Sequence, residues 1–121
     1  MKKPTHKEIS NKIRQAREAL TNGNLAIATP DIIAADALEL DYEIEELQAI
    51  LDKLLVQAKP DDYTGTFPPQ RAYVDDIFQS DLFAFSLTSS CFACKIYFKF
   101  ALKDDTLWLV SLHKDRPGKR G

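Results

Sequence analysis

Side chains able to do acid–base chemistry on a phosphodiester gather in the last quarter of the sequence. Tyr97, Lys99 and His113 stand in two segments where apolar and polar residues alternate. Histidine titrates near neutral pH and suits proton transfer. Lysine stabilises charge that develops on phosphoryl oxygens, and tyrosine stacks on bases or hydrogen-bonds phosphate. Cleavage of RNA by its own 2′-hydroxyl needs such a set: a base, an acid and a cation beside the phosphate.

The cysteines Cys91 and Cys94 form a C-x-x-C motif, which suggests zinc binding or redox chemistry. Zinc normally takes four ligands, and no second Cys or His pair stands at a matching spacing. A thioredoxin-type pair would start a helix, whereas these residues lead into a strand-like segment. We interpret both cysteines as small apolar residues, and we expect neither a metal site nor a cofactor.

Three helices are predicted in the first half of the chain, over 5–22, 31–38 and 42–58. The first and third carry an apolar residue every three or four positions, which gives each helix one apolar stripe. The second follows Thr29-Pro30, a capping residue with proline at the first helical position. We expect these helices to bury their stripes against the elements that hold the polar residues named above.

After a loop rich in proline, the pattern changes to a period of two, which predicts an antiparallel sheet over 72–113. Asp104-Asp105 is expected to turn between the last two strands. The segment 25–28 is predicted to be only an extended link, and 114–121 is a basic tail. We therefore expect one α+β domain over all 121 residues, with N-terminal helices packed on a C-terminal antiparallel sheet.

The register of the last hairpin decides which side chains meet. A loop of two residues pairs Lys103 with Thr106 and mixes apolar and polar residues on each face. A loop of three residues pairs Leu102 with Thr106 and makes one face apolar throughout. We predict the second register, in which Phe98 lies opposite Val110. Its other face gathers Lys95, Tyr97, Lys99, Ser111 and His113.

Charge is distributed unevenly, although the net charge is only −2. The segment 31–52 holds eight acidic residues and no Lys or Arg, whereas 95–121 holds seven Lys or Arg. The basic segment suits a phosphate backbone, and the acidic one would repel it or bind a basic partner, unless both are simply solvated surface. No apolar run is long enough to span a bilayer or to form a signal peptide. We expect a cytoplasmic protein without membrane contact.

Residues 28–114 resemble the motility quorum-sensing regulator (MqsR) toxin family. Five segments carry the resemblance: 34–41 (AADALELD), 61–64 (DDYT), 74–78 (VDDIF), 97–99 (YFK) and 110–113 (VSLH). The resemblance implies a RelE-like α+β fold. It also implies a toxin that cleaves mRNA without a metal and is silenced by a cognate antitoxin protein.

Carried over by position, the family's strand tyrosine corresponds to Tyr97, and its terminal catalytic lysine corresponds to His113. Its loop lysine and its glutamine correspond to Thr64 and Asp75, which supply neither a positive charge nor an amide. We predict Tyr97, His113 and Lys99 as catalytic residues: the tyrosine positions RNA, the histidine acts as acid or base, and the lysine holds phosphate. Further substrate contacts are expected from Lys95, Lys114, Arg116, Arg71 and Ser111.

Because Thr64 and Asp75 depart from the family pattern, a second hypothesis is a non-catalytic protein-interaction or regulatory module on the same fold. Its partner would bind the acidic segment 31–52 or an edge of the sheet. The acidic balance favours this alternative to a degree, since affinity for RNA comes largely from neutralised phosphates. RNA binding would have to be confined to one face.

Overall fold

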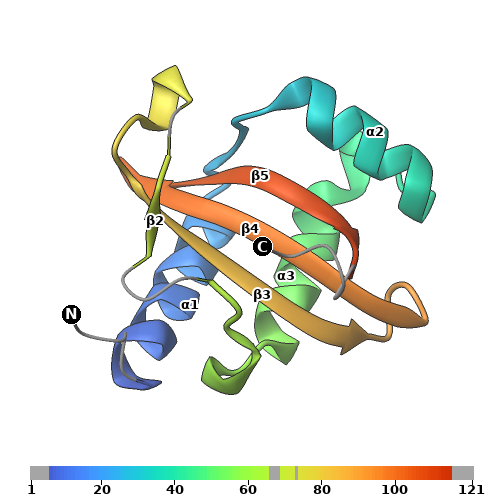
Figure 1. The fold of residues 1–121 in the computed structure, drawn as a ribbon, viewed down its shortest axis with the longest axis horizontal. Helices are drawn as coiled ribbons and strands as arrows, with labels where there is room; N and C mark the ends of the chain where they lie inside the picture. Colours follow the sequence, from blue (N-terminus) through green and yellow to red (C-terminus); the bar gives the residue numbers. More distant parts are fainter. Residues whose placement is uncertain (1–5, 66–68, 73, 116–121) are drawn as a thin grey trace.

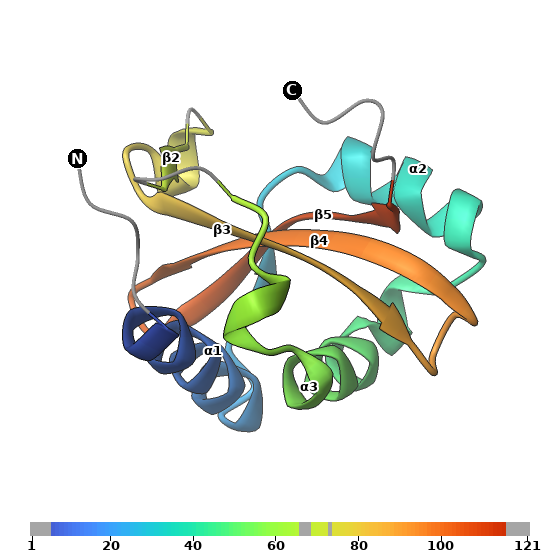
Figure 2. The same cartoon turned by 60° about the horizontal axis from the view of Figure 1, so that its bottom comes forward.

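The structure, a computed structural model, describes residues 6–65, 69–72 and 74–115. A five-stranded sheet in the order β1-β5-β4-β3-β2 is covered on one face by α1 and α3, while α2 lies along β5 (Figures 1 and 2). The expected α+β architecture, with N-terminal helices packed on a C-terminal sheet, is confirmed. The sheet is mixed rather than purely antiparallel, because β1 runs parallel to β5.

All three predicted helices are present, and their observed bounds lie close to the predicted ones. The third helix begins as a 3₁₀ turn, where the Glu43 N–H donates to the Glu46 carboxylate over 2.8 Å. No helix among the described residues is both long and apolar enough to cross a bilayer. In chain order the elements are α1 (His6–Thr21), β1 (Leu25–Ile27), α2 (Pro30–Leu40), η1 (Ile44–Glu46), α3 (Leu47–Gln57), η2 (Pro60–Asp62), β2 (Gln70–Arg71), η3 (Asp75–Ile77), β3 (Asp81–Ser89), β4 (Cys94–Lys103) and β5 (Thr106–Lys114).

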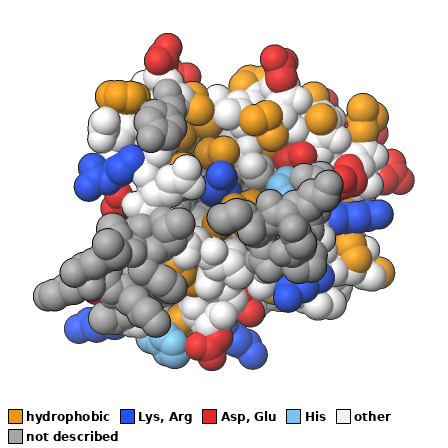
Figure 3. Space-filling view, viewed as in Figure 1, with side chains coloured by type: hydrophobic (Ala, Val, Ile, Leu, Met, Phe, Trp, Pro, Cys, Tyr) orange, Lys and Arg blue, Asp and Glu red, His pale blue; other side chains and the backbone are white. Residues whose placement is uncertain are grey.

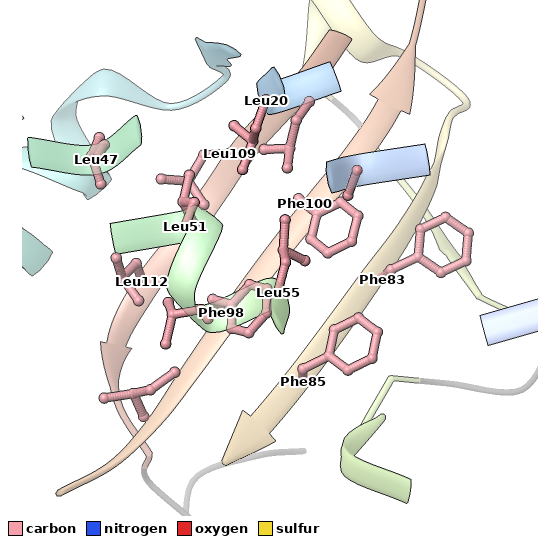
Figure 4. Packing of buried hydrophobic residues seen from close by; sticks show 14 of the residues in the cluster. Leu20, Leu47, Leu51, Leu55, Phe83, Phe85, Phe98, Phe100, Leu109 and Leu112 are labelled. Carbon is pink, nitrogen blue, oxygen red and sulfur yellow. The ribbon is translucent and has the colours of Figure 1, made fainter. Parts of the chain in front are cut away.

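The main core lies between the sheet and the helices α1 and α3. Phe85, Phe98 and Phe100 are fully buried there, and the Phe85 and Phe98 rings stack with centroids 5.5 Å apart. Leucines of α3, among them Leu51 and Leu55, lie over these rings (Figure 4). Burial of each such side chain contributes about 1.5–3 kcal/mol. The covered face therefore supplies most of the hydrophobic stabilisation.

The turn of the β4–β5 hairpin differs from our prediction. Asp104 and Asp105 have φ angles of 54° and 59°, and together they form a two-residue turn that pairs Lys103 with Thr106. Two positive φ angles match the twist of the flanking strands, and aspartate tolerates them better than most residues. The three-residue loop that we preferred is therefore wrong at this end of the hairpin.

A β-bulge in the middle of the same hairpin restores the apolar pattern. Phe100 pairs with Leu109 and the adjacent Lys99 pairs with Ser111, so Val110 is the extra residue. Beyond the bulge every residue of β5 is shifted by one position, and its leucines remain on the covered face. The bulge thus accommodates both the two-residue turn and the hydrophobic pattern, which compete in a regular hairpin.

The segment that we predicted as an extended link is a strand. β1 pairs in parallel with β5, with Leu25 opposite Leu107 and Ile27 opposite Leu109. It occupies only the first half of the outer edge of β5. The second half of that edge lies against α2 (Figure 1).

Candidate functional site

The face of the sheet turned away from α1 and α3 has two unlike ends. At one end, the segment that contains β2 and η3 covers a small apolar cluster. At the other end the strands present polar side chains, and Figure 3 shows atoms of basic residues and of a histidine near the middle of this face. The apolar cluster consists of Ala28, Ala72, Ile77, Leu82, Ala101 and Val110.

Tyr97 and His113 are direct partners across β4 and β5. Their rings stack with centroids 5.0 Å apart and planes inclined by 18°, and both side chains are half-buried. The predicted placement of the phenol and the imidazole on one face is confirmed. It follows from the bulge rather than from the register we preferred, because the bulge alone brings these two residues opposite each other.

One hydrogen bond determines which imidazole nitrogen can act as a base. His113 Nδ1 lies 2.7 Å from the carbonyl oxygen of Lys114. A carbonyl oxygen only accepts, so Nδ1 must carry a proton and donate it. In the neutral ring Nε2 then has the free lone pair, and this nitrogen is the one that can take a proton from a substrate hydroxyl.

Carboxylates of α2 hold the strand that carries His113. Asp36 Oδ2 accepts the N–H of Leu112 over 3.0 Å, and Glu39 Oε1 accepts the N–H of Lys114 over 2.8 Å. The Tyr42 hydroxyl donates to the carbonyl of Leu112 over 3.2 Å. These side chains bond the edge of β5 where β1 no longer reaches. Through the Lys114 backbone, Glu39 is linked to the carbonyl that orients His113.

Asp36 and Glu39 were missed at the level of sequence, although a signal for Asp36 exists. Asp36 lies on the same helical stripe as the buried residues Ile33 and Leu40, and it is only 6% exposed. A buried carboxylate is costly unless it accepts hydrogen bonds, so an acidic residue on an apolar stripe indicates a fixed partner. Burial, and to a smaller extent the nearby Asp36 carboxylate, raises the pKa of Tyr42 well above its ordinary value.

Lys99 occupies the next row of the same face. It pairs with Ala84 on β3 and with Ser111 on β5, and these small neighbours leave its side chain half-buried in the middle of the sheet. Burial lowers the pKa of the Lys99 amine from its ordinary value. A partly desolvated ammonium attracts a phosphate more strongly than one in bulk water. Ser111 is buried beside it and lines the floor of the site.

The structure does not gather all of the predicted phosphate contacts. Lys95 is exposed, two residues before Tyr97 on the same face. Lys114 pairs with Ile96 of the covered face, and neighbouring residues on a strand point to opposite sides, so its side chain leaves away from His113. Arg116 lies outside the described residues.

Arg71 does not join the site either. It lies on β2 with its Nε 3.0 Å from Asp81 Oδ1, and β2 pairs with the first residues of β3. Ser86, the residue of β3 opposite Tyr97, is five residues further on, which is about 17 Å along the strand. The guanidinium therefore belongs to the apolar end of this face, and the structure does not bring Arg71 together with the other predicted substrate contacts.

One polar contact extends the Tyr97 row to β3. Ser86 Oγ donates to Asp115 Oδ1 over 3.0 Å, and the Asp115 N–H donates to the carbonyl of Lys95 over 3.0 Å. A carboxylate thus lies beside the row that holds the imidazole and the phenol. Because this carboxylate repels a phosphate, we expect a phosphate to bind beside the neighbouring ammonium of Lys99.

Cys91 and Cys94 are both free thiols in and after the β3–β4 turn. Within the described parts of the chain, no three His, Cys, Asp or Glu residues are grouped so that they could hold a metal ion. Comparison of the chain with family models, with curated proteins and with solved structures finds no match.

Proposed function

We propose that this chain is a metal-independent endoribonuclease that acts as the toxin of a toxin–antitoxin pair. The observation that carries the proposal is the stacked Tyr97–His113 pair, one row from the half-buried amine of Lys99, on the sheet face turned away from α1 and α3. These three groups supply a base, a phosphate ligand and a cation without help from a metal. The toxin role rests on the sequence segments that resemble the MqsR family.

The geometry supports cleavage by the RNA's own 2′-hydroxyl. His113 Nε2 takes the proton of the 2′-hydroxyl, and the 2′-oxygen then attacks the adjacent phosphorus while the bond to the 5′-oxygen breaks. Lys99 stabilises the charge on the phosphoryl oxygens, and its lowered pKa suits it to protonate the leaving oxygen. Tyr97 hydrogen-bonds the phosphate or stacks on a base. The products are a 2′,3′-cyclic phosphate and a 5′-hydroxyl.

The test is cleavage of a single-stranded RNA by the purified protein in the presence of a chelator, with product ends identified by mass spectrometry. We expect His113→Ala to slow cleavage by about 10²–10⁴-fold, as loss of a general base does. Tyr97→Phe should also slow cleavage, because it removes the hydroxyl that would bond the phosphate. The stacked ring is kept. A 2′-deoxy substitution at the cleaved position should block the reaction.

The matched control is His6→Ala, which removes the exposed imidazole that pairs with Asp61 on the far side of the sheet. This variant should cleave at the wild-type rate. A folded wild-type protein that does not cleave RNA, or a His113→Ala variant as fast as wild type, would remove the proposal.

A second candidate function, docking of a partner protein, is supported by the outer face of α2. Leu38 is 86% exposed and Ile32 is 47% exposed, with the exposed Ala35 between them at helical spacing. The segment 31–52 around this stripe has eight acidic residues and no basic one. An apolar stripe in a segment whose charged residues are all acidic fits a partner helix whose apolar anchors are flanked by Lys and Arg. In a toxin, that helix would belong to the antitoxin.

The outer edge of β5 is not open to a partner strand, since β1 and the α2 carboxylates already bond it. The docking test therefore addresses the α2 stripe, with a synthetic amphipathic helix of Leu and Lys as the probe in calorimetry. Leu38→Ser should weaken binding about tenfold, or 1.4 kcal/mol, and Val56→Ser, at an apolar position on α3 that is 58% exposed, should not. Equal binding of a Leu/Glu helix would contradict this role.

A further inference from the structure

A polar depression opens beside the proposed catalytic row, at the free edge of β3. It has a volume of about 360 Å³, and it lies where the end of α3 and η2 pass along the strand. The Tyr63–Phe85 bridge and the Thr64 N–H, which donates to the Ala84 carbonyl over 2.9 Å, hold that passing segment in place. The polar lining consists of Gln57, Lys59, Asp62, Ser86, Thr88 and Lys95.

The strand register joins this depression to the catalytic row. Ser86 pairs with Tyr97, and Thr88 pairs with Lys95. Ser86 and Lys95 therefore belong to the border of both regions. Lys95 is two residues from Tyr97 on the same face of β4, which is about 7 Å along the strand. A single nucleotide can bridge that distance.

The lining suits a nucleotide with its phosphate. Lys59 and Lys95 bring two ammonium groups, and the Asp62 carboxylate is already engaged by the Lys59 backbone N–H over 2.9 Å. Lysine ammonium groups bind phosphates as point charges, and the hydroxyl of Thr88 adds a hydrogen-bonding group. Two ammonium groups and one carboxylate give the lining a net positive charge, while the Asp115 carboxylate is bonded to Ser86 at its border.

An amide on the wall has unused hydrogen-bonding capacity. Gln57 Nε2 donates to Ser90 Oγ over 3.0 Å, while Gln57 Oε1 is the one buried side-chain polar atom without a partner in the described parts of the chain. An unpaired buried acceptor is costly. A ligand that carries an N–H donor, as every nucleobase does on an edge, would satisfy it after a small rotation of the side chain.

We propose that this depression is the subsite for the nucleotide next to the cleaved bond. Lys95 and Lys59 hold its phosphate, and Gln57 bonds the edge of its base. The subsite rests on the proposed function, because it assigns a path to the same RNA strand. That path runs across the sheet from His113 over Tyr97 and leaves the molecule at the β3 edge.

The test compares a dinucleotide with trinucleotides extended by one residue on either side. One extension should raise kcat/KM in the wild-type protein, and Lys59→Gln and Lys95→Gln should each reduce that gain by about tenfold. A trinucleotide with a 2′-O-methyl group at the reacting position gives the Kd without cleavage. Each variant should lower the slope of log Kd against log salt concentration by about 0.7, the value for one phosphate contact to a single strand.

The matched control is Lys53→Gln, an exposed lysine of α3 that lies outside the depression. It should change neither the gain from the extension nor the salt slope. Gln57→Leu should alter the ranking of the four bases at the extended position. If His113-dependent cleavage is present and Lys59→Gln and Lys95→Gln behave like Lys53→Gln, the subsite is refuted and the proposed function stands. Absence of cleavage by the wild-type protein removes both.

Discussion

The two faces of the sheet are made from the same strands and serve different ends. Phe98 points toward α1 and α3 and is fully buried among aromatic rings. Its neighbour Tyr97 points to the other side and stacks on His113. The covered face is apolar over most of its length, whereas the open face changes from an apolar cluster at one end to half-buried polar groups at the other. Substitutions one residue apart should therefore separate stability from chemistry.

The largest effect is expected on the covered face. Phe98→Ala should lower the free energy of unfolding by about 3–5 kcal/mol, because it leaves a cavity among tightly packed rings. Tyr97→Phe should change it by less than about 0.5 kcal/mol, since the ring and its stacking stay. Urea denaturation measures both values. Similar losses in the two variants would show that the faces do not differ in this way.

A smaller loss is expected where α2 holds the strand of the open face. Asp36→Ala should cost about 1–3 kcal/mol, because the Leu112 N–H loses its buried acceptor. Asp36→Asn keeps an acceptor oxygen and should recover part of this loss. Denaturation gives the stabilities, and nitrogen chemical shifts of the His113 ring report whether Nδ1 still carries the proton. An unchanged ring in Asp36→Ala would show that the bond from Asp36 to Leu112 does not orient the imidazole.

Substitution of Lys99 should raise the free energy of unfolding, whereas the substitutions above lower it. Burial lowers the pKa of its amine, which means that the folded state holds the charged form at a cost. Lys99→Met should therefore raise the stability at pH 7 by about 0.5–1 kcal/mol, while RNA cleavage falls at least tenfold. The folded state binds this proton less tightly than the unfolded state, so the advantage of the variant should shrink as the pH rises toward the ordinary lysine pKa.

If the stability gain of Lys99→Met is the same at pH 7 and at pH 10, Lys99 does not carry a desolvated ammonium. A loss of stability in Lys99→Met would lead to the same conclusion. Either result would mean that the open face carries no energetic cost for its chemistry, and the contrast between the two faces would be weaker than we infer.

The smallest effect concerns a phenol on the covered face. Burial raises the pKa of Tyr63 to about 12, with smaller contributions from Asp81 and Tyr97. An unfolded tyrosine titrates near 10, so the folded state holds this proton more tightly. Stability should be unaffected by this group below about pH 10 and should fall as the pH rises from 10 toward 12.

Tyr63→Phe should make that alkaline loss of stability less steep, as measured by urea denaturation at a series of pH values. Some of the loss should persist, since the pKa of Tyr42 is raised in the same direction. An identical alkaline profile in the variant would show that Tyr63 does not titrate as a buried group.

Periodicity was sufficient to predict the helices and the last two strands, because each buries a regular stripe of side chains. It could not predict the bulge at Val110. The Asp104-Asp105 turn favours one register and the apolar pattern favours another, and only packing against α1 and α3 shows that both are satisfied. The pairing of Tyr97 with His113 depends on that bulge. The alternation of β4 placed Tyr97 on the polar face, but it did not show that His113 is its cross-strand partner.

Long-range contacts account for the remaining differences. β1 is too short for a strand signal, and it exists because β5 offers it an edge. Arg71 was predicted as a phosphate ligand from its charge alone, yet its position follows from pairing with β3 and from the neighbouring Asp81. Glu39 gave no pattern at all, since its partner is a backbone N–H far along the chain. Such contacts are set by topology, which local residue patterns do not encode.

The parallel pairing of β1 with β5 determines the order in which the molecule can be completed during synthesis. Leu25 leaves the ribosome well before its partner Leu107, so β1 cannot pair until β5 has been made. The imidazole of His113 is made later still, on the same strand. A chain that has not yet been synthesised through β5 therefore lacks both this pairing and the imidazole of His113, so a reaction that uses His113 can begin only after β5 has been made.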